Sequence, residues 1–322
     1  MKIVCYQSTD GPRCGVLEDG RVFDAASLLG HTGALRDAQA LLELGPDAVQ
    51  RLRSAAKSSN DTAIEGVRLL APVLRPPTIR DYSVFEGHAS MGGAWQLHEA
   101  WYRLPTFYFS NPLCVYGTGD VVPYPSASRK FDLEVELAVV IGREGRNVHA
   151  QNAMEHVAGF MIFVDWSSRD LQRDEMQLHL GPAKGKDSAN SFGPWLVTPD
   201  ELMHAMRDGQ LHTSATLKVN DVEWLSGTTG GMQHDWPALI ERASRDSRIV
   251  PGDVIGSGCV AGGSIPEMIR LGRSGRYLEP GDRLEISLDG LGVLTSTVGD
   301  RELEREGYRF LPPSREFKGS AA

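Results

Sequence analysis

The sequence predicts a mainly β protein with some helix, an α+β fold built from a small and a large unit. Segments with strand-like alternation or short apolar runs outnumber helical stretches along most of the 322 residues. No strand–helix alternation continues long enough for a parallel α/β fold. The 35 glycines and 18 prolines suit the many sharp reversals that short strands require.

Residues 1–75 are expected to form a small N-terminal α+β domain. Strand-like segments at 2–6 and 14–17 precede a turn, a short strand at 21–23 and a helical stretch rich in Ala and Leu at about 34–57. Residues 57–62 are polar and indicate a loop. The run Arg75–Pro76–Pro77 marks the boundary, because paired prolines end regular structure. Residues 76–322 then form the larger domain.

The larger domain alternates strand candidates with turn residues. Helices are expected at 147–158 and 236–247, the first with Asn147 as a possible cap. A hairpin is expected at 216–224 and another turn at Asp289–Gly290. The remaining strand candidates are 133–141, 160–164, 254–257 and 284–288.

Composition excludes several classes of protein. The net charge of -9 argues against a nucleic-acid or anionic-membrane partner, although a local cation can still attract an anionic substrate. The longest apolar run, residues 158–164, is far shorter than the ~20 residues of a membrane helix. The first residues turn polar too soon for a signal peptide. Four widely spaced cysteines indicate neither a zinc site nor a disulfide framework, so a cytoplasmic location is expected.

The segment from Phe131 to Gly142 carries the most informative pattern. In a strand, residues i and i+2 point to the same face and lie about 6.6–6.8 Å apart. Glu134 and Glu136 therefore share one face. Two flexible glutamates at this spacing can bind one divalent cation. An edge strand with a solvated acidic face is an equally good interpretation of this segment alone.

Asp165 favours the metal site. It ends a buried strand candidate, where a carboxylate can cap the following helix or can supply a third oxygen ligand. Three carboxylates without a nearby Cys or His favour a hard ion, Mg²⁺ ahead of Ca²⁺ or Mn²⁺.

Several motifs resemble the fumarylacetoacetate hydrolase family. They are Asp132–Leu–Glu–Val–Glu–Leu137, Val164–Asp–Trp–Ser–Ser–Arg–Asp–Leu–Gln172, Leu180–Gly–Pro–Ala–Lys–Gly–Lys186, Gly193–Pro–Trp–Leu–Val197 and Pro251–Gly–Asp–Val–Ile–Gly–Ser–Gly258. The resemblance extends over roughly residues 75–300. It implies a mixed β-sandwich roll, a divalent metal and a homodimer.

The resemblance also implies a reaction class. Family members cleave carbon–carbon bonds in β-diketo acids and acylpyruvates, a chemistry of aromatic compound catabolism. The expected function is therefore a metal-dependent hydrolase of a small oxo-acid such as fumarylacetoacetate. A lyase or isomerase acting on a 2-oxo acid is the alternative, as in relatives that decarboxylate oxaloacetate, isomerise or hydrate oxo-acids, or dehydrate sugar acids.

Residue roles follow from the same resemblance. Glu134, Glu136 and Asp165 match the metal ligands, and His88 matches the histidine that activates water. Glu267 matches the carboxylate that orients this histidine. Lys186 matches a catalytic lysine, and Gln172 and Tyr108 match substrate contacts. Cys259 stands where the family commonly has a substrate-binding threonine.

Two positions depart from the family pattern. Val84 replaces a fourth acidic ligand, so three protein carboxylates are expected at the metal. Cys259 is a weaker hydrogen-bond donor than a hydroxyl, which favours a different or bulkier substrate. Arg169 and Asp170 are expected to have a structural role as an ion pair or helix-start network. Arg103 is the candidate for a substrate-binding arginine.

Overall fold

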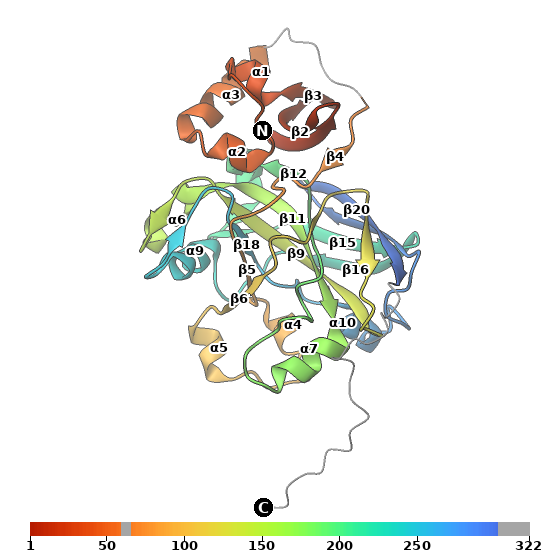
Figure 1. Ribbon diagram of the computed structural model, residues 1–322. Coiled ribbons are helices and arrows are strands. Elements are labelled where there is room, and N and C mark those ends of the chain that lie inside the picture. The colour runs from red at the N-terminus through yellow and green to blue at the C-terminus, as the bar shows by residue number, and fades with distance from the viewer. Residues whose placement is uncertain (59–65, 302–322) are drawn as a thin grey trace, which may run out of the picture.

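Two large β-sheets enclose the main apolar core of the molecule in the computed structural model, which describes residues 1–58 and 66–301 (Figure 1). The larger sheet has 11 strands in the order β3-β2-β1-β12-β11-β9-β18-β5-β6, with β4 beside β1 and β7 beside β12. The smaller sheet has five strands in the order β16-β15-β19-β20-β8. The predicted mainly β, α+β fold is confirmed.

The strands of the larger sheet are β1 (Lys2–Ser8), β2 (Gly11–Glu18), β3 (Arg21–Asp24), β4 (Leu69–Leu70), β5 (Ile79–Tyr82), β6 (Phe107–Ser110), β7 (Val115–Tyr116), β9 (Phe131–Ile141), β11 (Val157–Ser168), β12 (Asn190–Val197) and β18 (Val254–Gly256). Those of the smaller sheet are β8 (Asp120–Tyr124), β15 (Ser214–Val219), β16 (Val222–Thr228), β19 (Arg283–Leu288) and β20 (Gly292–Arg301). Two short ribbons pair β10 (Gly145–Arg146) with β17 (Arg248–Ile249) and β13 (Met206–Arg207) with β14 (Gln210–Leu211).

The helices are mostly short. Figure 1 shows α1–α3 at the top of the molecule, α4, α5, α7 and α10 gathered at the bottom, and α6 and α9 at the left. Their bounds are α1 (Ala25–Leu29), α2 (Ala38–Leu42), α3 (Pro46–Ser58), α4 (Glu86–Ala89), α5 (Glu99–Arg103), α6 (Ala150–Ala153), α7 (Arg169–Met176), α8 (Pro199–Leu202), α9 (Trp236–Ser244) and α10 (Ile265–Arg270), with 3₁₀ turns at Met154–His156 and Met203–Ala205.

Two predicted helices differ from the structure. The stretch 34–57 forms two helices, α2 and α3, because Gly45 takes a φ of 89° and Pro46 begins a new helix. The helix predicted at 147–158 is shorter and irregular. α6 is followed directly by the 3₁₀ turn Met154–His156, and β11 begins at Val157, so the last two predicted residues belong to the sheet.

The main core lies between the two sheets and depends on strict alternation along β9. Leu133, Leu137 and Val139 point into this core together with side chains of the smaller sheet. The alternate residues Ala138 and Val140 point to the opposite face, against a second core covered by α1–α3. Both faces of β9 are therefore buried, which places Glu134 and Glu136 inside the protein.

The N-terminal strands continue the larger sheet. β1 pairs with β12 through Lys2 opposite Val197 and Ile3 opposite Leu196. The division at residue 75 stays a prediction, and the predicted loop at 57–62 lies largely outside the described residues. Among the described residues, no helix is both long and apolar enough to cross a membrane.

Candidate metal centre

A row of polar residues crosses the middle of the larger sheet from β11 to β6. Asp165 lies directly opposite Glu134 in the pairing of β11 with β9. Two strands beyond β9 in the same sheet, Asp81 of β5 lies opposite Tyr108 of β6. β18 separates β9 from β5, and Gly256 is its residue beside Asp81. A Cβ atom at Gly256 would lie 2.5 Å from Oδ1 of Asp81, so the site requires glycine there.

Four carboxylates meet in this row. Asp81, Glu134, Glu136 and Asp165 each contribute an oxygen, and these four oxygens lie within 4.8 Å of one another. All four side chains are buried. The interpretation of β9 as a solvated edge strand is therefore wrong, because β9 pairs with β11 on one side and β18 on the other. Asp165 is also not a helix cap, since α7 begins after Ser168.

Three oxygens of the cluster have no hydrogen-bond partner among the described residues. They are Oδ1 of Asp81, Oε1 of Glu136 and Oδ1 of Asp165. A buried carboxylate oxygen without a donor is strongly disfavoured. A hard divalent cation with oxygen ligands would satisfy all three at once. The residues present therefore fit a divalent metal ion.

Two basic side chains partly neutralise the cluster. Nζ of Lys186 lies 2.5 Å from Oε2 of Glu134 and also donates to Oδ2 of Asp165. The Arg169 guanidinium donates to Oδ2 of Asp132 at 2.5 Å and to Oε1 of Glu134 at 2.7 Å. Lys186 is 3% exposed, so its ammonium is held inside the site rather than in solvent. A lysine in a glycine-rich loop is usually solvated, but Lys186 is buried against carboxylates.

Burial and the neighbouring charges of both signs shift the pKa values of the carboxylates in opposite directions. Burial, and then the neighbouring carboxylates, raise the pKa of Glu136 well above its ordinary value. Burial likewise raises the pKa of Asp165 to about 8 despite the nearby Lys186. Burial also acts to raise the pKa of Glu134, but Lys186 and Arg169 outweigh it and hold that pKa well below its ordinary range. Glu134 is therefore the most firmly ionised member.

His88 connects the carboxylate cluster to Glu267. Its Nδ1 lies 2.7 Å from Oε2 of Glu267, and its Nε2 lies 3.2 Å from Oε1 of Glu134. Burial acts to lower the pKa of His88, but Glu134 and then Glu267 outweigh it and raise this pKa to about 9. A cation shared by Glu134 would weaken that field and return the imidazole toward its neutral form.

Glu267 is held rigidly at the start of α10. Its carboxylate accepts hydrogen bonds from the backbone N–H groups of Gly262 and Ser264 and from the Ser264 hydroxyl. Together with the Ser264 side chain it forms a capping box. The capping geometry fixes the carboxylate, which in turn fixes the orientation of the His88 ring.

The structure brings the other predicted residues to the same place with one exception. The Tyr108 hydroxyl lies 2.7 Å from Oδ2 of Asp81 and 2.5 Å from Oδ2 of Asp165. Gln172 accepts a hydrogen bond from Arg169 at 2.9 Å. Cys259 is buried within 4.8 Å of ligand atoms of His88 and Glu267. Arg103, in contrast, is an exposed residue of α5 paired with Glu99 and does not join the cluster.

Two members of the site were missed from the sequence. Asp81 adds a fourth carboxylate to the cluster, where three were expected, and the set that binds the metal stays a prediction. A charged residue inside the otherwise buried strand segment Ile79–Tyr82 was the available signal. Arg169 was given a structural role, yet it contacts Glu134 directly. Its position beside Asp165 along the chain did not indicate that its side chain turns back to β9.

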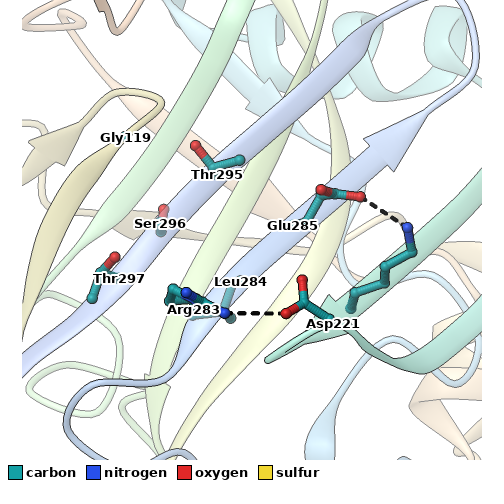
Figure 2. Close-up of a pocket in the computed structure, with 9 residues that line it drawn as sticks. Gly119, Asp221, Arg283, Leu284, Glu285, Thr295, Ser296 and Thr297 are labelled. Carbon is teal, nitrogen blue, oxygen red and sulfur yellow. Dashed lines mark hydrogen bonds and ion pairs between the residues drawn. The ribbon is translucent and has the colours of Figure 1, made fainter.

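A separate groove on the smaller sheet has none of these features. Figure 2 shows its lining residues, in which Arg283 pairs with Asp221. Lys218 pairs with Glu285 in the same groove. Its charged groups already compensate one another, and it contains none of the predicted site residues.

Known proteins share both the sequence pattern and the fold. The family model described as Fumarylacetoacetate (FAA) hydrolase C-terminal matches residues 78–299. The chain is 28% identical over 268 residues to oxaloacetate tautomerase YisK of Bacillus subtilis, covering 78% of this chain and 81% of that protein. It is also 28% identical over 306 residues to maleylpyruvate hydrolase of Aquipseudomonas alcaligenes, covering 89% and 96% of the two chains.

A solved structure has the same fold. Maleylpyruvate hydrolase from Sphingobium sp. SYK-6, in complex with manganese(II) and pyruvate, superposes with a TM-score of 0.71, covering 94% of this chain and all of that one, at 24% identity. The match of the family model spans more than half of the chain. The chain therefore belongs to the fumarylacetoacetate hydrolase family.

Proposed function

We propose that this protein is a divalent-metal-dependent hydrolase that cleaves a carbon–carbon bond of an acylpyruvate or related β-diketo acid. The observation that carries the proposal is the hydrogen bond between His88 and Glu267 beside a four-carboxylate cluster. A hydrolase must activate water, and a histidine fixed by a carboxylate is suited to that task.

Asp81, Glu134, Glu136 and Asp165 would hold the cation, with Mg²⁺ or Mn²⁺ as the expected metal. A bound divalent cation would polarise the chelated carbonyl and stabilise the enolate that leaves. The maleylpyruvate hydrolase from Sphingobium was solved with manganese and pyruvate, which supports a site for a chelating 2-oxo acid in this protein. Magnesium is the first expectation, because hard oxygen donors without Cys or His in the cluster favour it.

This chain's own residues would carry the proton transfers. Nε2 of His88 faces the cluster and would accept a proton from water, while Glu267 holds the proton on Nδ1 and stabilises the imidazolium. Lys186 and Gln172 would provide positive charge and hydrogen bonding for the oxygen on which negative charge develops. The added water ends in the released acid, and pyruvate leaves as its enolate and takes up a proton.

Keto–enol tautomerisation of oxaloacetate is a second candidate. It is supported by the relative named oxaloacetate tautomerase, which aligns over 268 residues. The same His88 could move a proton between carbon and oxygen of a chelated 2-oxo acid, and no water would be consumed. The two candidates therefore share the metal and the base but differ in whether a bond is broken by water.

A substrate panel distinguishes the candidates. Purified protein with Mg²⁺ or Mn²⁺, and with chelator, would be assayed on acylpyruvates, fumarylacetoacetate analogues and enol-oxaloacetate. Release of pyruvate from an acylpyruvate supports hydrolysis, whereas conversion of enol-oxaloacetate to keto-oxaloacetate without release of pyruvate supports tautomerisation. Undiminished turnover in chelator would contradict both. The expected homodimer is tested separately by light scattering after size-exclusion chromatography.

A further inference from the structure

Three consecutive backbone N–H groups converge on the carboxylate of Glu175. Oε2 accepts from Ala183 at 2.8 Å and from Gly185 at 3.0 Å, and Oε1 accepts from Lys184 at 2.7 Å. Successive N–H groups that point at one anion form a nest, and here the anion is a side chain of the same protein. The loop that ends at Lys186 is therefore fastened to α7 through one residue.

The position of Glu175 in α7 is unfavourable for a carboxylate. It is the penultimate residue of the helix Arg169–Met176. The negative end of the helix dipole lies there, where a carboxylate is normally disfavoured. Three N–H donors on this side chain compensate for that position.

The fastened loop leads directly to the centre of the site. The carbonyl of Gly185 accepts the N–H of Ser168 at 2.8 Å. A Cβ atom at Gly185 would lie 2.8 Å from the backbone of Gln172, so the loop lies in close contact with α7. The next residue, Lys186, places its ammonium between Glu134 and Asp165. Glu175 thus joins the segment carrying Gln172 to the segment carrying Lys186.

We propose that Glu175 is a positioning residue that sets Lys186 and Gln172 at the distance needed to bind the oxygens of a chelating 2-oxo acid. It acts through the loop 183–185 and does not touch the substrate. This inference rests on the proposed function, because it concerns the same site. It predicts a defect in binding of the oxo-acid rather than in binding of the metal, since all four carboxylates stay in place.

The test uses the full chain loaded with Mn²⁺ and oxalate as the probe, a planar dianion that chelates as a 2-oxo acid enolate does. Glu175→Gln keeps the shape of the side chain but turns an N–H donor toward the backbone donors. We expect it to raise the Kd of oxalate at least tenfold while the Kd of Mn²⁺ changes less than threefold. Asp174→Asn removes the same charge one residue earlier, from an exposed side chain that contacts Arg173, and should leave both constants unchanged.

A double-mutant cycle tests whether the effect passes through Lys186. In a Lys186→Met background, Glu175→Gln should produce no further loss of oxalate affinity. Should Lys186→Met not fold, amide hydrogen exchange decides: Glu175→Gln should speed exchange at residues 183–185 without changing the urea midpoint. Wild-type oxalate affinity in Glu175→Gln, or an undiminished loss in the Lys186→Met background, would overturn the inference. Failure of the wild type to bind Mn²⁺ would instead overturn the proposed function, and this inference with it.

Discussion

Nδ1 of His88 lies 2.7 Å from Oε2 of Glu267, although the two residues are 179 positions apart in the chain. Nε2 of the same ring faces Glu134 at 3.2 Å. The imidazole therefore connects a rigid carboxylate at the start of α10 to the carboxylate cluster on β9, which is the arrangement expected of a general base beside a metal site.

Replacing His88 should remove most of the activity. We expect His88→Ala to lower kcat about 10²–10⁴-fold, the usual range for loss of a general base. Glu267→Gln should lower kcat less, because the amide still contacts the ring but no longer stabilises the imidazolium. Steady-state kinetics on the best acylpyruvate measures both. His31→Ala, at an exposed histidine of the N-terminal region, is the control and should behave as wild type.

Removing one carboxylate should weaken metal binding but not the metal-free fold. In Glu136→Gln we expect at least a tenfold higher Kd for Mn²⁺, because an oxygen that lacks another partner is lost. The metal-free variant should be as stable as wild type or more so, because like-charge repulsion falls. Titration calorimetry and thermal melts in chelator measure the two effects. Wild-type protein at about 100 times the metal Kd should gain about 2.7 kcal/mol of stability.

The metal-free protein should lose stability as pH rises from about 5 to 9. The folded-state pKa of Asp165, about 8, exceeds the ordinary carboxyl value, and that of His88, about 9, exceeds the ordinary imidazole value. The folded state therefore binds more protons than the unfolded state across this range, and the free energy of unfolding falls with pH. Urea unfolding in chelator measures the slope. Saturating Mg²⁺ or Mn²⁺ should flatten it, because the cation replaces these protons.

Lys186 should matter far more to stability than an exposed lysine in a similar pair. Lys186→Met leaves Glu134 and Asp165 without their buried ammonium, and should destabilise the metal-free protein by about 3–5 kcal/mol. Lys218→Met breaks an exposed pair with Glu285 and should cost about 0–1 kcal/mol. Urea unfolding of both variants provides the comparison. Equal losses would contradict the buried role of Lys186.

Cys259 should not act as a nucleophile. Burial, and then Glu134 and Glu267, raise its pKa well above the ordinary thiol value, so the reactive thiolate is disfavoured. Cys259→Ala should keep more than about a tenth of wild-type kcat. Its KM should change by a larger factor than its kcat, because loss of a contact that only binds the substrate raises KM and leaves kcat unchanged. Iodoacetamide should not inactivate the native enzyme. Complete loss of turnover in Cys259→Ala would contradict this prediction.

The sequence by itself determined the β-rich class of the fold, the strand carrying Glu134 and Glu136, and the family. Strand alternation and motif order are local properties, so they can be seen in a linear chain. The limits of local signals appear at residues 147–158, where the predicted helix is reduced to α6 and a 3₁₀ turn and its last two residues join β11.

Only the tertiary structure decided how the site is assembled. β18 and β5 place Asp81 beside carboxylates more than fifty positions away in sequence, and α7 turns Arg169 back onto β9. The choice between a solvated edge and a buried site for Glu134 depended on which strands flank β9, which no local pattern specifies. Strand order and helix direction are set by long-range packing, and they convert a short acidic pattern into a buried cluster of carboxylates that fits a divalent cation.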